Sequence, residues 1–374
     1  MILTMNSRQR VNMTLNHKEP DRVPIDFGGT IVSTITAVAY KSLLKYYGIK
    51  DKVEIIDIIQ GLVEPHYKIQ KLYGCDFRRI VLGPPDNWQL TIDENNCFVD
   101  EYGIKRKKAS YYYDIVDSPL KNASLEDLKN FTWPDPHDPG RVRGLKGEAK
   151  KLYEETNYVI IADMISGGIF EQCLRIRGFE QFLTDMVMNK KFANALLDKI
   201  LEIYLGFYEE YIKTIGDYVH IFALADDLGM QNGLLISPNL YRELIKPRHK
   251  ILYDYIKKNS KAKIFHHSCG SISPLIGDLI EVGVDILNPI QTSAANMNPE
   301  LLKSEFGADI TFFGGIDVQK LLPNLTPKEI KEETKRIISI MGKNGGYIMA
   351  PSHNIQPDVP PENIDAMYMA AVDK

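Results

Sequence analysis

Cysteine is scarce in this chain. Its 374 residues include four cysteines, Cys75, Cys97, Cys173 and Cys269. That number is too small for a disulfide framework and favours a reducing compartment. The first ten residues lack the apolar core of a signal peptide, and no apolar run approaches the roughly 18 residues of a transmembrane helix. We therefore expect a cytoplasmic protein without a membrane partner.

A surplus of either charge is also missing. The chain has 45 Lys and Arg residues against 49 Asp and Glu residues, a net charge of -4. This balance provides no basic surface for nucleic acid. The paired glycines at 314–315 and 345–346 fit neither a GxGxxG motif nor a P-loop, so no nucleotide site is expected. The 44% hydrophobic and 25% charged content excludes disordered, collagen-like and coiled-coil chains.

Short apolar runs that end in turn or polar residues recur along the chain. Such runs are typical of parallel strands that are buried on both faces. Helical spacing of apolar residues separates several of them, at residues 179–211, 241–257, 272–282 and 326–341. The runs predict an α/β fold, a (β/α)8 TIM barrel, and a doubly wound open sheet is the alternative. The expected strands are Val23–Phe27, Phe77–Leu82, Tyr158–Ala162, Tyr218–Leu224, Lys263–Phe265, Val284–Leu287, Asp309–Phe313 and Tyr347–Met349.

The length of the chain allows either two domains or one large barrel. The strand pattern favours a single barrel domain over residues 1–374, with an N-terminal extension. Residues 87–118 break the alternation of strand and helix, because short β-like runs flank the polar residues 94–96 and another follows. We predict an inserted β-hairpin or short meander there.

Polar side chains gather where the expected strands end. In a (β/α)8 barrel, active sites lie at the C-terminal ends of the strands. We therefore expect the following residues to surround one mouth: Asp163, Asp226–Asp227, His266–Cys269, Asn288 with Gln291, Asp317 with Gln319, and His353 with Gln356.

A histidine and a cysteine stand two residues apart at the end of the fifth expected strand. Residues i and i+2 of a strand point the same way, so His267 and Cys269 face one point and His266 faces away. With His353 reaching across the mouth, these residues would give Zn(II) three ligands and an open fourth position, as in catalytic zinc sites. The alternatives are a core cysteine beside a hydrogen-bonded histidine, and a histidine bonded within a Pro-rich loop.

Further polar residues are candidates for catalysis and substrate binding. We expect Asp227 and Glu171 to be catalytic, as additional ligands or as acceptors behind the metal. Asp226 and Asp227 are equally suited to capping the helix that follows them. The expected substrate-binding residues are Asp163, Asn288, Gln291, Asp317 and Gln356.

Several motifs taken together resemble the uroporphyrinogen-decarboxylase-like superfamily, over essentially the whole chain. They lie at residues 6–15, 20–24, 267–270, 283–289, 313–317 and 354–363. The resemblance implies a single (β/α)8 barrel. True decarboxylases of the superfamily carry an N-terminal arginine run that holds the porphyrin carboxylates. The matching residues 26–34 contain no arginine, which argues against a porphyrin substrate.

The other branch that the chain resembles contains zinc-dependent methyltransferases that work with corrinoid proteins. Its members carry H-x-C on one strand and a distant Cys after the last strand, where this sequence has His353. Histidine also binds zinc, but the change argues against a thiol acceptor. The resemblance implies methyl transfer from a methylated small molecule, preferably an aryl methyl ether, to the Co(I) of a separate corrinoid protein. Relatives of this barrel often pair, so a homodimer is a candidate assembly.

Other activities remain open from the sequence. The methyl group could instead pass from a methylcorrinoid to a thiol. A metal-free decarboxylation, in which His353 gives a proton or binds a carboxylate, is a further alternative. A barrel that only binds a small molecule or a corrinoid partner is the last one, although it would not need so many polar residues at its strand ends.

Overall fold

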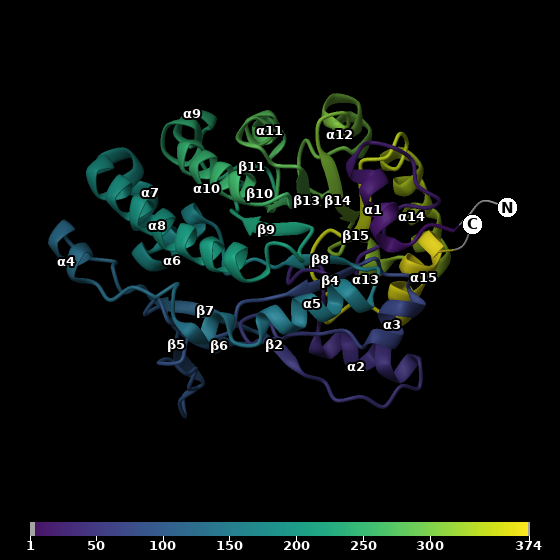
Figure 1. Ribbon diagram of the computed structural model, residues 1–374, viewed down its shortest axis with the longest axis horizontal. Helices are drawn as coiled ribbons and strands as arrows, with labels where there is room; N and C mark the ends of the chain where they lie inside the picture. The colour runs from purple at the N-terminus through teal and green to yellow at the C-terminus, as the bar shows by residue number, and fades with distance from the viewer. Residues whose placement is uncertain (1–3, 373–374) are drawn as a thin grey trace.

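Seven parallel strands form one curled sheet at the centre of the molecule. A computed structural model describes residues 4–372, so the predicted domain range of 1–374 extends beyond the described residues at both ends. Figure 1 shows the strands side by side, with helices around their outer face. In spatial order the strands are β15 (Tyr347–Pro351), β14 (Thr311–Ile316), β13 (Ile286–Ile290), β12 (Lys263–His267), β9 (Ile221–Ala225), β8 (Val159–Ala162) and β4 (Phe77–Ile80).

The two edges of this sheet are joined by the backbone at residue 25. Ile25 forms a parallel bridge with Met349 of β15. On its other side, the Ile25 carbonyl accepts a hydrogen bond of 2.9 Å from the backbone N–H of Asp76, which precedes β4. The predicted first strand is therefore reduced to a single bridge, and the other predicted strands are present. This arrangement confirms the predicted barrel over the open sheet, because an open doubly wound sheet has no such closure.

Helices cover the outer face of the barrel. The predicted helix at 179–211 is divided at Asn189, whose side chain caps the second of two helices. The helices are α1 (Ser7–Leu15), α2 (Ala37–Tyr46), α3 (Tyr67–Leu72), α4 (Leu125–Asn130), α5 (Leu145–Glu155), α6 (Ile169–Arg177), α7 (Phe179–Met188), α8 (Lys190–Ile215), α9 (Pro238–Leu240), α10 (Lys246–Asn259), α11 (Ile276–Val282), α12 (Pro299–Phe306), α13 (Leu321–Asn324), α14 (Pro327–Met341) and α15 (Pro361–Val372). Short 3-10 helices at Pro139–Val142 and Ser273–Leu275 and a π-helix at Tyr241–Ile245 complete them.

Buried side chains form two separate cores, one inside the barrel and one between the sheet and the helices. Alternate residues of each strand supply the inner core, such as Ile221 and Ala223 of β9 and Phe265 of β12. Their neighbours Phe222 and Ile264 belong to the outer core. This alternation follows from the pleat of a strand, which sends successive side chains to opposite faces.

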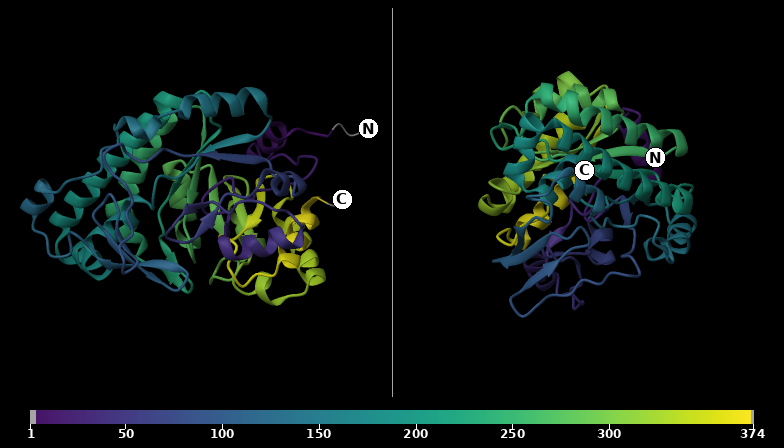
Figure 2. Two further views of the ribbon diagram at one scale, coloured as in Figure 1. Left: turned by 90° about the horizontal axis from the view of Figure 1, so that it is seen from below. Right: turned by 90° about the vertical axis from the view of Figure 1, so that its left-hand side faces the viewer.

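Smaller sheets lie outside the barrel. The predicted insertion is an antiparallel sheet of β5 (Cys97–Val99), β6 (Lys105–Ala109) and β7 (Tyr112–Asp117), in the order β5-β6-β7. It corresponds to the meander form of that prediction, and Figure 2 shows this blue segment at one side of the barrel. A second small sheet joins β1 (Ile35–Thr36), β3 (Leu62–Val63) and β2 (Ile55–Asp57), and a third pairs β10 (Gly229–Met230) with β11 (Gly233–Leu234).

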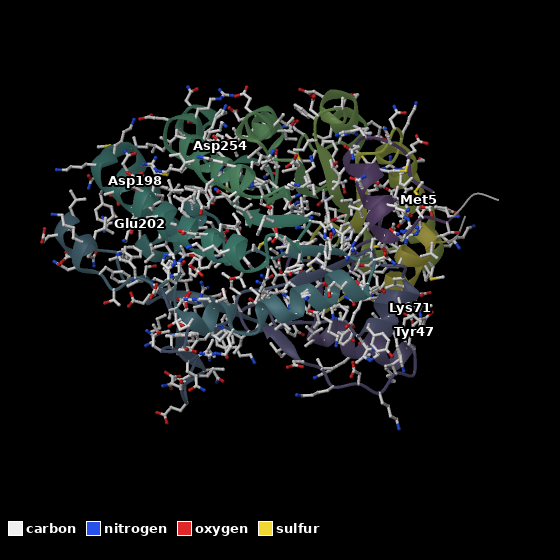
Figure 3. All side chains as sticks on the ribbon, in the orientation of Figure 1. Met5, Tyr47, Lys71, Asp198, Glu202 and Asp254 are labelled. Atoms are coloured by element: carbon white, nitrogen blue, oxygen red, sulfur yellow. The ribbon has the colours of Figure 1, made fainter. Side chains whose placement is uncertain are left out.

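Ion pairs also tie the outer helices together. Asp198 of α8, labelled in Figure 3, accepts hydrogen bonds of 2.9 and 2.6 Å from the guanidinium of Arg248 on α10.

Within residues 4–372, no helix has both the length and the apolar character that crossing a bilayer requires.

A buried cluster of charges holds the N-terminal segment against the bottom of the barrel. The Asp76 carboxylate is fully buried and accepts hydrogen bonds from Arg10 Nη1 at 2.7 Å and Arg22 Nη1 at 2.8 Å. It also accepts one from the Ile25 backbone at 3.0 Å, beside the barrel closure. A buried charge that loses one of its paired groups destabilises the folded protein.

We predict that the Asp76→Ala substitution lowers the free energy of unfolding by about 3–5 kcal/mol, because it removes the buried carboxylate that pairs with both Arg10 and Arg22 and leaves Arg10 with Asp21 alone. Urea unfolding followed by circular dichroism measures the change. The control is Glu126→Gln, which breaks an exposed pair with Lys129 and should leave the midpoint unchanged. Equal midpoints for the two variants would contradict the structural role of Asp76.

Candidate metal centre

Three neighbouring strands bring their polar ends together at the mouth of the barrel. His267 of β12 is in register with Ala225 of β9 on one side and with Asn288 of β13 on the other. Asp227 follows Ala225 by two residues. Parallel strands end at the same edge of a sheet, so residues from separate parts of the sequence meet here.

The three predicted metal ligands lie close together. The nitrogen and sulfur ligand atoms of His267, Cys269 and His353 are all within 4.8 Å of one another. His267 Nε2 is 3.2 Å from Cys269 Sγ. His353 follows β15, three strands away from β12, and its ring centroid is 6.1 Å from that of His267. Closure of the barrel is therefore what brings His353 to the pair.

The hydrogen bonds of His267 leave one ring nitrogen for a ligand. Its Nδ1 is 2.6 Å from Asn288 Oδ1, an amide oxygen that can only accept. The proton is therefore on Nδ1, and the lone pair of Nε2 is directed at Cys269 and His353. By contrast, His266 points outward and bonds to the Tyr253 hydroxyl at 2.7 Å. The structure thus agrees with the sequence assignment of His267 as the inward residue.

Burial shifts the protonation of the other two candidates. Burial and, to a lesser extent, the neighbouring His267 together lower the pKa of His353 to about 4. His353 is therefore neutral at pH 7, as a metal ligand must be. Burial raises the pKa of the Cys269 thiol well above its usual value, and the charges of Asp227 and Glu171 add to that shift. The thiolate that a metal needs would thus form only when the cation binds.

The loop after β12 is held in place by the neighbouring strand ends. The backbone N–H of Cys269 donates to Asp227 Oδ1 at 2.8 Å, and that of Gly270 donates to Gln291 Oε1 at 2.9 Å. Gly270 has a φ of +87°, and a Cβ there would lie 2.6 Å from the carbonyl carbon of Gly229. Only glycine permits this turn, which directs the Cys269 side chain toward His267.

The two adjacent aspartates have different roles. Asp226 is fully buried and accepts hydrogen bonds from the backbone of Phe170 at 2.9 Å and Glu171 at 2.8 Å, at the start of α6. It also bonds to His249 Nε2 at 2.9 Å. Asp226 is thus a helix cap, as the sequence allowed, but for α6 rather than for the helix that follows it. Asp227 is left to face the candidate metal site.

A cavity of about 300 Å³ opens beside the three candidate ligands. His267, His353, Asp227 and Glu171 line it together with further residues that include Asp57, Gln60, Met164, Arg106 and Arg175. Glu171 forms an ion pair with Arg175, one turn along α6. Burial raises the pKa of Glu171, and the charges of Asp227 and Asp226 raise it further against the opposing charge of Arg175.

The five predicted substrate-binding residues all have partners inside the protein. Asn288 accepts a hydrogen bond from His267, and Gln291 accepts one from the backbone of Gly270. Asp317 accepts hydrogen bonds from the backbone of the turn at residues 319–320. Gln356 bonds to the Tyr112 hydroxyl, and Asp163 accepts from the backbone of Ile31 at 2.8 Å. None of the five is among the described residues that line the cavity. Their contact with a substrate stays a prediction.

Sequence reasoning missed two cationic residues of the cavity, Arg106 from the inserted β6 and Arg175 from α6. The spacing of Glu171 and Arg175 is a usable signal, because i and i+4 residues of a helix form ion pairs. Arg106 offers no such signal, since it lies between lysines in a stretch that reads as a solvated charge run.

Comparison with known proteins identifies the family of this barrel. Residues 114–374, more than half of the chain, match the family described as Uroporphyrinogen decarboxylase (URO-D). The chain belongs to the URO-D family. Among solved structures, a methyltransferase from Methanosarcina mazei superposes with a TM-score of 0.68 at 17% sequence identity, over 99% of both chains. This likeness confirms the fold.

The proteins that are similar in sequence include a methyltransferase and decarboxylases. A methylated-thiol–coenzyme M methyltransferase from Methanosarcina mazei is 25% identical over 254 residues, which are 67% of this chain and 64% of the relative. This chain therefore spans less than two thirds of that relative. A uroporphyrinogen decarboxylase from Pseudomonas fluorescens Pf-5 is 24% identical over 338 residues, 83% of this chain and 89% of the relative.

The stretch that matches the arginine run of the decarboxylases is a buried turn. The Asp26 carboxylate accepts a hydrogen bond from the Gly29 backbone at 2.9 Å and another from the Ser33 hydroxyl. Asp26 is fully buried, and this burial raises its pKa to about 7. The stretch thus uses its polar groups to hold its own conformation.

We predict that Asp26 makes stability depend on pH. Its folded-state pKa of about 7 exceeds the unfolded value of 3.8, so the folded state binds more protons between these limits. The free energy of unfolding should therefore fall as pH rises from about 4 to about 7. Asp26→Asn, which retains an acceptor, removes this loss and should be more stable at pH 8 by up to about 4 kcal/mol. Urea unfolding at pH 5 and pH 8 measures it, and an equal difference at both would refute the assignment.

Proposed function

We propose that this chain is a zinc-dependent methyltransferase that moves a methyl group from a methylated small molecule to the Co(I) of a separate corrinoid protein. The cluster of His267, Cys269 and His353 carries the proposal. Membership of the URO-D family and the methyltransferase relative support it. A cytoplasmic location and a homodimer stay predictions.

The donor set fits zinc. Two ligands of a tetrahedral zinc lie about 3.5 Å apart, as follows from its bond lengths. His267 Nε2 and Cys269 Sγ are 3.2 Å apart. Asn288 holds His267 from behind in the way that outer hydrogen bonds orient metal-bound histidines. Three protein ligands leave one position open, as in catalytic zinc sites.

The reaction breaks the bond between a heteroatom and a methyl carbon. Zinc, when bound, supplies a Lewis acid that stabilises the negative charge left on that heteroatom. The electron pair of the broken bond stays on the heteroatom, and Co(I) supplies the pair that forms the new bond to carbon. The demethylated heteroatom then needs a proton. Glu171 lines the cavity, and burial raises the pKa of its carboxyl group against the opposing charge of Arg175. We assign it as the acid, because giving up the proton leaves a carboxylate that pairs with Arg175.

A groove next to the cavity suits a docking partner. Its volume is about 940 Å³, and it shares Glu171, Arg175 and Asp227 with the inner cavity. Phe179 and Met230 on its wall are 56% and 53% exposed. Exposed apolar side chains of this kind are typical of protein interaction sites. We assign the groove to the corrinoid protein, whose cobalt must approach the methyl group at the mouth of the barrel.

Two classes of methyl donor are compatible with the site. An aryl methyl ether is the donor preferred from the sequence. A methylated thiol is the second candidate, because the relative from Methanosarcina mazei is named for one. Zinc accepts both oxygen and sulfur ligands, so the open position suits either heteroatom and the two classes are separated by assay.

We predict that the purified protein contains about one zinc per chain, and that Cys269→Ala and His353→Ala each lose it, because each variant removes one of three ligands. Elemental analysis of the protein measures the ratio. Cys97→Ser removes a thiol of the inserted sheet instead and should keep its zinc. Full zinc in both ligand variants would overturn the metal assignment.

We predict that the zinc-loaded protein forms methylcobalamin from free cob(I)alamin and an aryl methyl ether or a methylated thiol under anaerobic conditions. The absorbance of the corrinoid follows the reaction, and Cys269→Ala should abolish it. Release of methyl groups from methylcobalamin to thiols alone would favour the reverse reaction. Consumption of uroporphyrinogen without metal would favour decarboxylation.

A further inference from the structure

The inserted sheet contains one buried arginine on an otherwise exposed strand. Arg106 is 6% exposed, although the other four residues of β6 are exposed to solvent. Arginine is almost never buried to this extent unless it is paired. The side chain lies on the inner face of the sheet, on the wall of the cavity that also contains His267 and His353.

The pairing of Arg106 is incomplete. Its Nε donates to Asp100 Oδ2 at 3.3 Å, which is long for a charge-assisted bond. Within residues 4–372, the two Nη groups have no hydrogen-bond partner, although a guanidinium carries five N–H donors. The Nη atoms are not among the described buried atoms that lack a partner, so they face the open cavity, where a group from outside the protein can accept their hydrogen bonds.

The acidic side chains of the cavity each have a bonding partner within the protein. Glu171 pairs with Arg175, Asp227 accepts from the backbone of Cys269, and Asp57 accepts from the backbone of Gln60 at 2.6 Å. Burial lowers the pKa of Arg106, and the nearby positive charge of Arg175 lowers it further. An anion that enters the cavity beside the Arg106 Nη groups would accept their hydrogen bonds and offset this repulsion.

We propose that the methyl donor is a small carboxylate, held by the Nη groups of Arg106 while its methylated heteroatom faces His267, Cys269 and His353. This inference rests on the proposed function and assigns its substrate class. A planar guanidinium binds a carboxylate through two parallel hydrogen bonds, so Arg106 both recognises the acid and sets its orientation. The cavity of about 300 Å³ is at the small end of ligand sites, which favours a compact acid.

Binding of matched pairs of compounds to the intact purified protein tests the proposal without methyl transfer. The pairs are 4-methoxybenzoate with 4-methoxybenzamide, methoxyacetate with methoxyacetamide, and 3-(methylthio)propionate with its amide. Isothermal titration calorimetry gives each Kd. At least one acid should bind about tenfold more tightly than its amide, because only the acid forms two charge-assisted bonds.

Variants of strand β6 test whether Arg106 causes the preference for the acid over its amide. Arg106→Gln should remove the preference for the acid while the Kd of the amide changes less than about twofold. Arg106→Lys keeps the charge but loses the planar fork, so it should retain part of the preference. The matched control is Lys107→Gln, which removes the same charge from the exposed face of β6 and should leave both Kd values unchanged. Thermal unfolding checks that each variant is folded.

The outcomes separate this inference from the proposed function. If the acids bind through Arg106 but no methyl group reaches cob(I)alamin, the carboxylate site stands and the proposed reaction fails. If methyl transfer occurs with neutral donors as well as with acids, the reaction stands and the inference fails. Equal Kd values for every acid and its amide, or equal weakening of both in Arg106→Gln, would also overturn the inference.

Discussion

The alternation of side chains along strand β12 is the constraint on which the site depends. Phe265 packs in the inner core, His266 bonds on the helical side, and His267 faces the cavity, because successive residues point to opposite faces. A shift of one residue would turn His267 into the helical layer. The register with β13 also places Asn288 where it accepts from Nδ1 of His267, which leaves Nε2 directed at Cys269 and His353. Packing of the barrel therefore sets the orientation of the candidate metal ligands.

Features that depend on local periodicity could be predicted from the sequence. Seven of the expected strands are present, and the pleat of β12 accounts for the inward direction of His267, whereas Cys269 lies beyond the strand and depends on the turn at Gly270. The position of His353 beside that pair required one further assumption, that the sheet closes, and the bridge at Ile25 provides the closure. Ile25 itself was expected within a full strand. Its bridge is short because the chain departs at once into the buried turn that Asp26 stabilises.

Features that depend on contacts between distant segments could not be predicted. Asp317 has the residue type and strand-end position of a ligand contact, yet its carboxylate accepts from the backbone of the next turn. Arg106 is the opposite case, because its sequence suggests an exposed side chain and the structure buries it. Its lysine neighbours make it resemble a solvated charge, and only the folding of the inserted sheet against the barrel buries it. Neither outcome is encoded within a few residues, because each depends on what the tertiary structure leaves exposed.

The expected source of positive charge differs between this chain and the decarboxylases that it resembles. Those proteins are expected to hold carboxylates with arginines near the N-terminus, where this chain has a buried turn around Asp26. On our proposal, the cation comes instead from Arg106 in the inserted sheet. A (β/α)8 barrel allows such a change, since its strands fix the reacting groups while its loops vary. One recruited guanidinium can orient a single carboxylate, whereas a porphyrin with many carboxylates needs several. On our proposal, moving the cation from one loop to another would let the same barrel select a smaller acid.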